Sequence, residues 1–242
     1  MIEVANVTKT YGKKQNAFTA LNDVSLQIPE GATVAIIGKS GSGKSTLMHV
    51  MSGLDHPTSG SVTVGGKDIH QLKRRALDRF RAKEMSFIFQ AFFVEANQTC
   101  YQNVVLPLEI AKVRRSHRKK LVMDALAAVD LTEKANTNAK NLSGGQKQRL
   151  AIARSISNSP KLIFADEPTG NLDSTTGDLI IDLLFDLNKK IGCTLIIVTH
   201  DQDLADKCQM QIKLKDGEII STTTKKAPAQ KKRASKPRKA VK

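Results

Sequence analysis

Residues 38–45, GKSGSGKS, have the composition and spacing of a phosphate-binding loop. They fit the pattern G-x-x-x-x-G-K-[ST] and join an apolar run at 33–38 to a helical pattern that begins at Lys44. The glycines allow successive backbone N–H groups to surround an anion, and a helix N-terminus adds positive potential. We expect Lys44 to hold the β- and γ-phosphates, Ser45 to ligate Mg²⁺ and Thr46 to add a phosphate contact. An ordinary Gly-Ser turn is the alternative, and the strand–loop–helix order argues against it.

An acidic pair, Asp166 and Glu167, ends a second apolar run, KLIFADE. Asp166 is placed to hold the coordination shell of Mg²⁺, as the second acidic element of phosphate-loop enzymes does. Glu167 is placed to orient or deprotonate a water that attacks the γ-phosphate. An exposed acidic turn before Pro168 is the alternative. The phosphate loop in the same chain favours the functional interpretation.

Four runs rich in β-branched or aromatic residues have the length of strands and end near a polar residue: 33–38, 85–90, 161–167 and 194–200. Continuous apolar runs of this kind are typical of a parallel sheet covered on both faces, and helical patterns such as 174–191 alternate with them. The alternation predicts an α/β domain whose ligands bind beyond the carboxyl ends of the strands. Gln90 and His200 end two of the runs, so we expect them beside the γ-phosphate. A merely solvated or structurally bonded side chain is the alternative for each.

The stretch NLSGGQKQR begins a helix in an unusual way. Ser143 and Gln146 form the pattern of a capping box, and the apolar periodicity that follows predicts a helix. Gly144 and Gly145 occupy its first turn, although each glycine destabilises a helix by up to ~1 kcal/mol relative to alanine. A helix N-terminus with two glycines and a hydroxyl suits an anion, here the γ end of a triphosphate. The sequence leaves open whether that anion lies in the same chain or in another one.

Composition limits the class of protein further. The 242 residues include three widely separated cysteines, Cys100, Cys193 and Cys208, which argue for free thiols and against a disulfide framework or a zinc site. The sequence shows neither a signal peptide nor an apolar run long enough to cross a bilayer, so we expect a cytosolic protein.

The net charge of +15 is unevenly distributed. Residues 221–242 hold nine Lys or Arg and no acidic residue, which leaves +6 for residues 1–220. With almost no large apolar side chain, residues 221–242 are predicted to be a basic disordered tail.

Taken together, these motifs resemble those of ATP-binding cassette (ABC) ATPases. The matching segments are GKSGSGKST, Gln90, LSGGQ (142–146), LIFADE (162–167), GNLD (170–173) and His200. The resemblance covers residues 1–220, expected to form one nucleotide-binding domain. It implies a phosphate-loop ATPase core of mainly parallel sheet, with an N-terminal antiparallel β part and an inserted α-helical subdomain at about 91–155.

The resemblance also implies roles for individual residues. ATP contacts are expected from Tyr11, Gly38, Lys39, Ser40, Gly41, Ser42, Gly43, Lys44, Ser45 and Thr46, with Tyr11 stacking on adenine. In a head-to-tail dimer, the ATP of the other subunit is expected to meet Leu142, Ser143, Gly144, Gly145 and Gln146. Catalytic roles fall to Glu167, His200 and Gln90, Mg²⁺ contacts to Ser45, Gln90 and Asp166, and a dimer contact to Asp173. A partly buried structural aromatic remains the alternative for Tyr11.

A finer resemblance concerns the membrane partner. GLDHPTSG, NVVLPL, DEPTGNLDS and VTHDQDLA are similar to the branch that contains lipoprotein-release, macrolide-export, antimicrobial-peptide-resistance and cell-division ATPases. It implies a permease with a large extracytoplasmic domain, and a subunit held at the inner face of the cell membrane. The chain departs from this branch in three places: after Gln90, at Ala139 and Asn141 just before the LSGGQ motif, and in the basic stretch 112–120.

The basic segments allow other partners. Lys/Arg runs bind nucleic-acid phosphates, so a soluble ATPase acting on nucleic acid or ribosomes is the alternative function. A single cassette without an inserted coiled coil argues against it. The tail is also a candidate for contact with anionic lipid.

Overall fold

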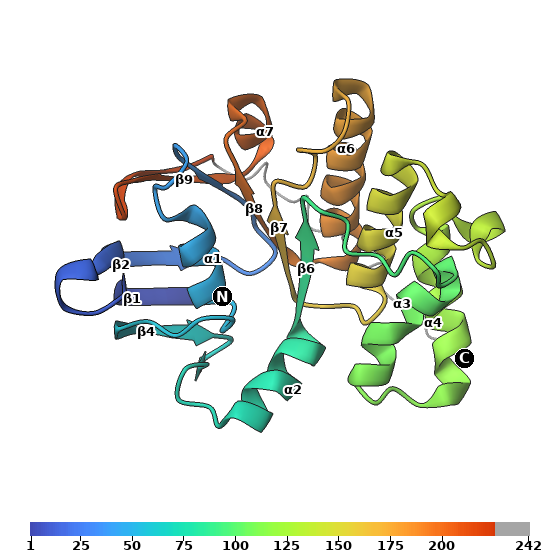
Figure 1. The fold of residues 1–242 in the computed structure, drawn as a ribbon, viewed down its shortest axis with the longest axis horizontal. Coiled ribbons are helices and arrows are strands. Elements are labelled where there is room, and N and C mark those ends of the chain that lie inside the picture. Colours follow the sequence, from blue (N-terminus) through green and yellow to red (C-terminus); the bar gives the residue numbers. More distant parts are fainter. Residues whose placement is uncertain (226–242) are drawn as a thin grey trace, which may run out of the picture.

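The computed structural model describes residues 1–225, which form two β-sheets flanked by helices (Figure 1). The smaller sheet is antiparallel and has the strand order β2-β1-β4-β5. Its strands are β1 (Ile2–Tyr11), β2 (Phe18–Ile28), β4 (Ser59–Val64) and β5 (Lys67–Asp68), with a 3₁₀ turn at Lys14–Asn16 between the first two. The expected N-terminal antiparallel part is thus confirmed.

The larger sheet contains all four predicted strands. Its order is β10-β9-β3-β8-β7-β6, and β9, β3, β8, β7 and β6 run parallel. The bounds are β3 (Thr33–Ile37), β6 (Met85–Phe89), β7 (Leu162–Asp166), β8 (Thr194–Thr199), β9 (Met210–Lys215) and β10 (Glu218–Thr224). The parallel pairing brings the carboxyl ends of β3, β6, β7 and β8 to one edge, as the polar residues that follow them predicted.

Helices cover both faces of this sheet and form a separate group beside it (Figure 1). Those connected to the sheets are α1 (Lys44–Met51), α2 (Arg74–Glu84), α6 (Ser174–Ile191) and α7 (Gln202–Lys207). The group inserted between β6 and β7 comprises α3 (Cys100–Ile110), α4 (Arg115–Ala127), α5 (Gly144–Ile156) and 3₁₀ turns at Thr132–Lys134 and Ala139–Asn141. The expected α/β fold with an antiparallel part and inserted helices is confirmed.

Two hydrophobic cores explain why the strands are continuously apolar. In β7, Ile163 and Ala165 face the core that includes α5 and α6, whereas Leu162 and Phe164 face the core that includes α1 and the antiparallel sheet. Alternate residues of a strand point to opposite faces, so burial on both faces requires an unbroken apolar run. The rigid sheet then fixes the positions of the loops at its carboxyl edge.

The predicted start of the disordered tail is wrong. Residues 221–224 belong to β10, where Thr224 pairs with Met210 of β9. The stretch STTT is rich in threonine, whose β-branched side chain suits an edge strand despite its polarity. Residues 226–242, the rest of the predicted tail, lie outside the described part of the chain.

The three cysteines are buried and carry free thiols, as predicted. Burial raises the pKa of Cys193 to about 11 and that of Cys208 to about 12, so these thiols stay protonated at neutral pH. Within residues 1–225 no helix is long and apolar enough to span a membrane.

Candidate active site

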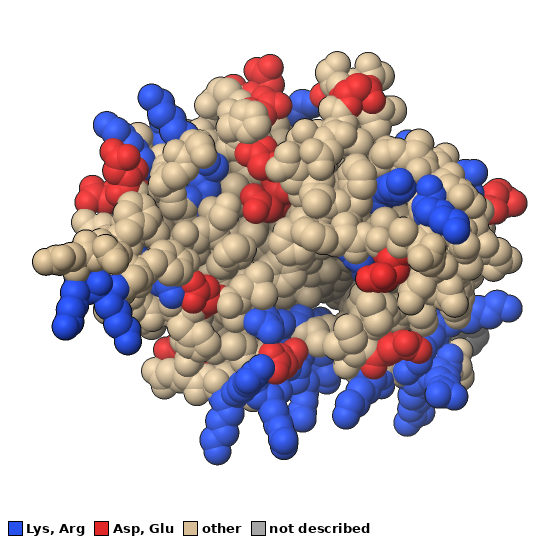
Figure 2. Space-filling model, viewed as in Figure 1, with Lys and Arg blue, Asp and Glu red and all other residues tan. Residues whose placement is uncertain are grey.

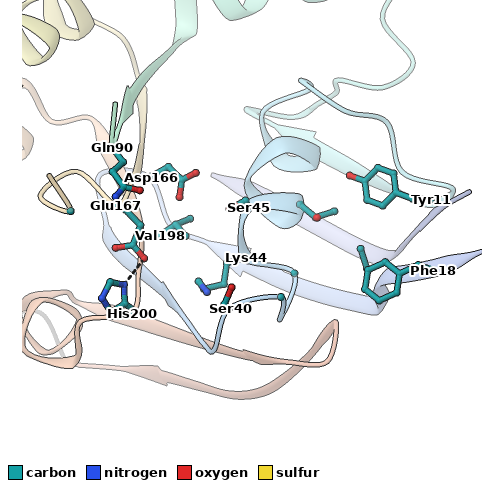
Figure 3. Close-up of a pocket in the computed structure, with 15 residues that line it drawn as sticks. Tyr11, Phe18, Ser40, Lys44, Ser45, Gln90, Asp166, Glu167, Val198 and His200 are labelled. Carbon is teal, nitrogen blue, oxygen red and sulfur yellow. Dashed lines mark hydrogen bonds and ion pairs between the residues drawn. The ribbon is translucent and has the colours of Figure 1, made fainter. Parts of the chain in front are cut away.

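A cavity of about 740 Å³ opens at the carboxyl edge of the larger sheet (Figure 3). The residues around it come from the phosphate loop, the ends of β6, β7 and β8, and the antiparallel sheet. They include Tyr11, Phe18, Ser40, Gly41, Gly43, Lys44, Ser45, Thr46, Gln90, Asp166, Glu167 and His200. Most of the predicted phosphate, metal and catalytic residues therefore share one cavity.

The phosphate loop has the shape of an anion cradle. Lys44 Nζ donates hydrogen bonds to the carbonyl oxygens of Gly38 and Lys39, both at 2.9 Å, which places the ammonium inside the loop. Gly43 has a φ of 99°, and a Cβ there would lie 2.5 Å from the carbonyl oxygen of Ala20. Only glycine fits at this position.

The loop also presents polar groups that a bound anion would satisfy. No side chain caps the N-terminus of helix α1, which begins after Gly43. Its first backbone N–H groups can therefore donate hydrogen bonds to a bound ligand. The buried Ser42 Oγ has no hydrogen-bond partner in the described structure. The N–H groups at the start of α1 fit a polyphosphate, whose oxygens accept several hydrogen bonds, whereas Ser42 does not line the cavity.

The acidic pair lies beside this loop in the same cavity, with Asp166 next to Ser45 (Figure 3). Burial and the neighbouring Glu167 charge raise the pKa of Asp166 above its usual range, while Lys44 partly opposes this shift. Residues 1–225 contain no group of three or more His, Cys, Asp or Glu side chains that would form a complete metal site. The Ser45 hydroxyl and Asp166 carboxylate suit Mg²⁺ bound together with a phosphate, because Mg²⁺ takes few protein ligands and completes its shell with phosphate oxygens and water.

Glu167 is held in an uncommon backbone conformation, with φ 45°. Its N–H donates to the carbonyl oxygen of Val198 at 2.9 Å. Its Oε1 lies 2.8 Å from His200 Nδ1, so the ends of β7 and β8 are connected through these side chains. The arrangement directs the carboxylate into the cavity, where a water could be oriented.

Gln90 is connected to the loop that follows Glu167. Its Nε2 donates to Asn171 Oδ1 at 3.3 Å, and Asn171 Nδ2 donates to the Gln90 carbonyl oxygen at 2.9 Å. A Cβ at Gly170 would lie 2.8 Å from Gln90 Nε2. Sequence reasoning did not single out Asn171, because its partner lies 81 residues away.

The predicted capping box is confirmed but lies outside this cavity. Ser143 Oγ accepts from the Gln146 N–H at 3.3 Å, and Gln146 Oε1 accepts from the Ser143 N–H at 3.1 Å. Ser143, Gly144, Gly145 and Gln146 line a separate cavity of about 480 Å³, together with Asn171, Asp173 and Thr176. Leu142 is buried beneath them. A single chain therefore does not bring this helix end to its own phosphate loop.

The two glycines of this helix end have different surroundings. A Cβ at Gly145 would lie 2.7 Å from Thr176 Cγ2 of α6, so packing within the chain favours glycine there. A Cβ at Gly144 would meet nothing closer than 3.7 Å. Contacts within the chain thus account for Gly145 and leave Gly144 unexplained.

Asp173 has a local structural function in the chain. Its Oδ1 accepts a hydrogen bond from the Thr176 N–H at 2.9 Å, so it caps α6, and this bond lowers its pKa. A second contact missed by sequence reasoning lies nearby: buried Gln148 of α5 donates to the Pro168 carbonyl oxygen at 2.6 Å. This hydrogen bond fastens α5, called the signature helix below because it begins at the LSGGQ motif, to the loop that carries Glu167.

Two aromatic side chains form the far end of the large cavity. Tyr11 and Phe18 are register partners on β1 and β2, and they are 40% and 61% exposed. Tyr11 was predicted from the resemblance to ABC ATPases, whereas Phe18 was missed because one exposed aromatic carries little sequence signal. Their flat apolar faces suit a purine ring.

Comparisons with known proteins identify the family. The family model described as ABC transporter matches residues 21–170. The chain belongs to the ABC transporter ATPase family. Over 91% of its length it is 42% identical to the lipoprotein-releasing system ATP-binding protein LolD of Geobacter metallireducens, of which it covers 98%. It is equally identical, again over 91% of its length, to the methionine import protein MetN of Geobacillus kaustophilus, of which it covers 64%.

A solved structure also supports the assignment of this chain to the ABC transporter ATPase family. The dimeric ATP-binding cassette MJ0796, bound to ADP and Pi, matches it with a TM-score of 0.83 and 39% identity, over 93% of this chain and 98% of that one. The protein is therefore an ATP-hydrolysing subunit, with ATP as its nucleotide and Mg²⁺ as the usual ion of the family. Membership also implies a second ATPase subunit and a membrane permease as partners.

We predict that Asp166→Asn raises the thermal unfolding midpoint of the nucleotide-free ABC ATPase at neutral pH. Because the folded state raises the pKa of Asp166, ionising this group destabilises the fold at pH values above that pKa. The amide removes the penalty, so the gain should be present at pH 7.5 and vanish below about pH 3.9, the ordinary pKa of Asp. Circular dichroism melts in EDTA would measure it.

Asp182→Asn, on the exposed surface of α6, is the matched control and should leave the midpoint unchanged. A lower midpoint for Asp166→Asn than for this control would contradict the prediction.

Proposed function

We propose that two copies of this ABC ATPase enclose two Mg-ATP molecules, each held by one phosphate loop and closed by the signature helix of the other copy. The separation of the two half-sites in one chain supports this arrangement most directly. The signature residues line a different cavity from Lys44 and Ser45. The similar cassette MJ0796 is itself dimeric.

The donors on each half-site complement one another. Residues 38–46 offer backbone N–H groups and the Lys44 ammonium to the β- and γ-phosphates, while Tyr11 contacts adenine. Ser143 and the first N–H groups of α5 supply the donors for the exposed side of the γ-phosphate. Asp173 lines the same cavity as Ser143, which suits contact with the opposite subunit. Gly144, which has no packing reason within the chain, would allow the nucleotide to approach closely.

Hydrolysis then depends on a positioned water. Glu167 accepts the proton of that water, and His200, 2.8 Å away, orients the carboxylate and contacts the γ-phosphate. Gln90, fixed by Asn171, reports the state of the γ-phosphate to the segment that follows it. Bound Mg²⁺ would neutralise phosphate charge, with Ser45, Asp166 and Gln90 as its protein-side ligands.

The free energy of ATP binding and hydrolysis drives movement in a membrane permease. We place its docking site beside Gln90, on residues 91–99 and the inserted helices, which we propose to form one subdomain at about 91–155. This would hold the subunit at the inner face of the cell membrane. The branch similarity favours a permease with a large extracytoplasmic domain, acting in export, lipoprotein or peptide handling, or force transmission.

The cargo is not assigned, since a lipoprotein-releasing and a methionine-import protein share the same 42% identity with this chain. A soluble ATPase acting on nucleic acid is the second candidate, favoured by the basic stretch 112–120 and the basic residues near the C-terminus. Purification from native membranes decides between them. A co-purifying permease supports the transporter, whereas RNA or ribosomes support the second candidate.

Glu167→Gln should lower ATP turnover on the order of 10²–10⁴-fold, because the amide cannot accept the water proton. It should also trap a dimer, since ATP stays intact between the subunits. Turnover is measured by phosphate release and dimerisation by size-exclusion chromatography with ATP and Mg²⁺. Glu133→Gln, at an exposed position in the inserted helices, is the control. Full activity in Glu167→Gln would remove this residue as the base.

Gly144→Ala should increase the stability of the fold and lower ATP turnover. Alanine is a better helix former, so the free energy of unfolding should rise by up to ~1 kcal/mol. Turnover should fall by roughly tenfold or more, equivalent to about 1.4 kcal/mol, because the methyl group would lie where the other subunit's nucleotide approaches. Urea unfolding and phosphate release measure the two effects.

Gly145→Ala combined with Thr176→Ser provides the comparison, since the serine removes the methyl group that a new Cβ would meet. If Gly144→Ala were stabilised and fully active, the proposed approach of a second subunit would be wrong.

A further inference from the structure

Lys and Arg side chains gather along the lower edge of the molecule, beneath α2 and beneath the α3–α4 hairpin (Figure 2). We define the basic band as residues 73–84 and 109–124. The two segments contain twelve Lys or Arg and four Asp or Glu, a net charge of +8. The rest of residues 1–220 contains seventeen basic and nineteen acidic residues. The positive charge of the folded part is therefore concentrated on this band.

Every acidic residue of the band is already neutralised. Asp78 pairs with Arg81, Glu84 with Lys161, Glu109 with Arg118, and Asp124 with Lys120. Nine cations have no ion-pair partner in residues 1–225: Lys73, Arg74, Arg75, Arg79, Lys83, Lys112, Arg114, Arg115 and Lys119. All nine are exposed. Their charge is available to an external anionic surface.

Five of these cations lie at helix N-termini, where they do not stabilise the helices. Lys73 is the N-cap residue of α2 and is followed by Arg74 and Arg75, and Arg114 is the N-cap residue of α4 and is followed by Arg115. Neither helix has an acidic residue in its first turn or a side-chain cap. Positive charge at a helix N-terminus is unfavourable, because the first N–H groups of the helix already carry partial positive charge. Binding of an anionic ligand that neutralises these cations would explain why they are placed there.

We propose that the basic band binds the headgroups of anionic phospholipids beside the permease. This inference rests on the proposed membrane attachment. One segment of the band comes directly before β6, and the other begins at the end of α3, the helix that follows residues 91–99, so both lie near the proposed docking site in sequence. Each Lys or Arg near an anionic membrane surface contributes about 1 kcal/mol, or roughly fivefold in binding. Nine such groups would orient the subunit on the bilayer.

The composition of the band favours lipid over nucleic acid. Single-stranded nucleic acids are bound with aromatic side chains on which bases stack. The band contains one Phe and no Tyr or Trp, and that residue, Phe80, is only half-buried and packs against the core under Lys67. Exposed Ile110, at the edge of the band, adds an apolar group suited to the lipid interface.

The test is binding of the full chain to vesicles of phosphatidylcholine with 30% phosphatidylglycerol at low salt. Arg75→Glu/Arg79→Glu and Arg115→Glu/Lys119→Glu should each weaken binding by about tenfold or more. Lys189→Glu/Lys190→Glu, on exposed α6, makes the same charge change away from the band and is the matched control. The C-terminal segment is identical in all variants, so its contribution cancels.

Unchanged ATP turnover in solution confirms that each variant is folded and distinguishes this inference from the proposed ATPase mechanism. Binding that resists both band variants, or falls equally in the control, would overturn the proposal. So would stronger binding of the wild type to RNA than to vesicles at equal phosphate concentration, if that binding were lost in the band variants.

An independent observation concerns Tyr11. Its hydroxyl donates to Asp55 Oδ2 at 2.7 Å, and Lys9 Nζ donates to Asp55 Oδ1 at 2.7 Å. Lys9 Nζ also lies 4.7 Å from the centroid of the Tyr11 ring. The carboxylate therefore holds both the tip of the ring and the cation that faces it, although Asp55 lies 44 residues from Tyr11.

We infer that Asp55 is a positioning residue for adenine binding, acting through Tyr11. It fixes the ring at the angle that leaves its open face in the cavity. This inference rests on the proposed adenine contact of Tyr11. Asp55→Ala should raise the KM for ATP about fivefold and leave kcat unchanged, and Asp55→Asn, which keeps an acceptor for the hydroxyl, should restore most of the loss.

Tyr11→Phe removes the same hydrogen bond, so the Tyr11→Phe/Asp55→Ala double variant should be no worse than Asp55→Ala. If Tyr11→Ala left KM unchanged, the proposed adenine contact itself would fail. If Tyr11→Ala raised KM and Asp55→Ala did not, the positioning role alone would be wrong.

Discussion

The parallel register of β3, β8, β7 and β6 is the constraint on which the rest of the structure depends. It brings the phosphate loop, the acidic pair, Gln90 and His200 to one edge of the sheet, although they lie up to 162 positions apart in the chain. The register is fixed because each strand is buried on both faces, and a slip of one residue would exchange the two cores. The loops that follow these strands are held in place because the strand ends are fixed. A half-buried Asp166 beside Glu167 can be maintained only on a scaffold of this kind.

The edge is also where the chain accepts unfavourable local features. Glu167 has a positive φ, and Asp166 has a raised pKa. Each feature would be relieved by a bound polyphosphate and its cation, or serves to direct a side chain toward them. The surrounding sheet supplies the stability that these groups reduce, as expected where a site is organised before its ligand arrives.

In the proposed dimer, one chain forms only part of each site. The signature helix is fastened to its own acidic loop through Gln148 and Pro168, yet its open end faces a different cavity. In the proposed dimer, this hydrogen bond connects the helix end that meets the nucleotide of one subunit to the acidic loop of the other subunit. The nucleotide site, the helix end and the Gln90–Asn171 contact form one continuous set of packed elements within the fold.

Sequence patterns were sufficient to predict the phosphate loop, the four central strands, the capping box and the acidic pair, because each is encoded by residues that are neighbours along the chain. Only the tertiary structure revealed the contacts of Gln148, Asn171 and Asp55, whose partners lie 20, 81 and 44 residues away. It also revealed that threonines 222–224 extend an edge strand, and that two separated basic helices share one face. Local propensity and spacing specify elements, whereas the packing of distant elements decides which side chains meet.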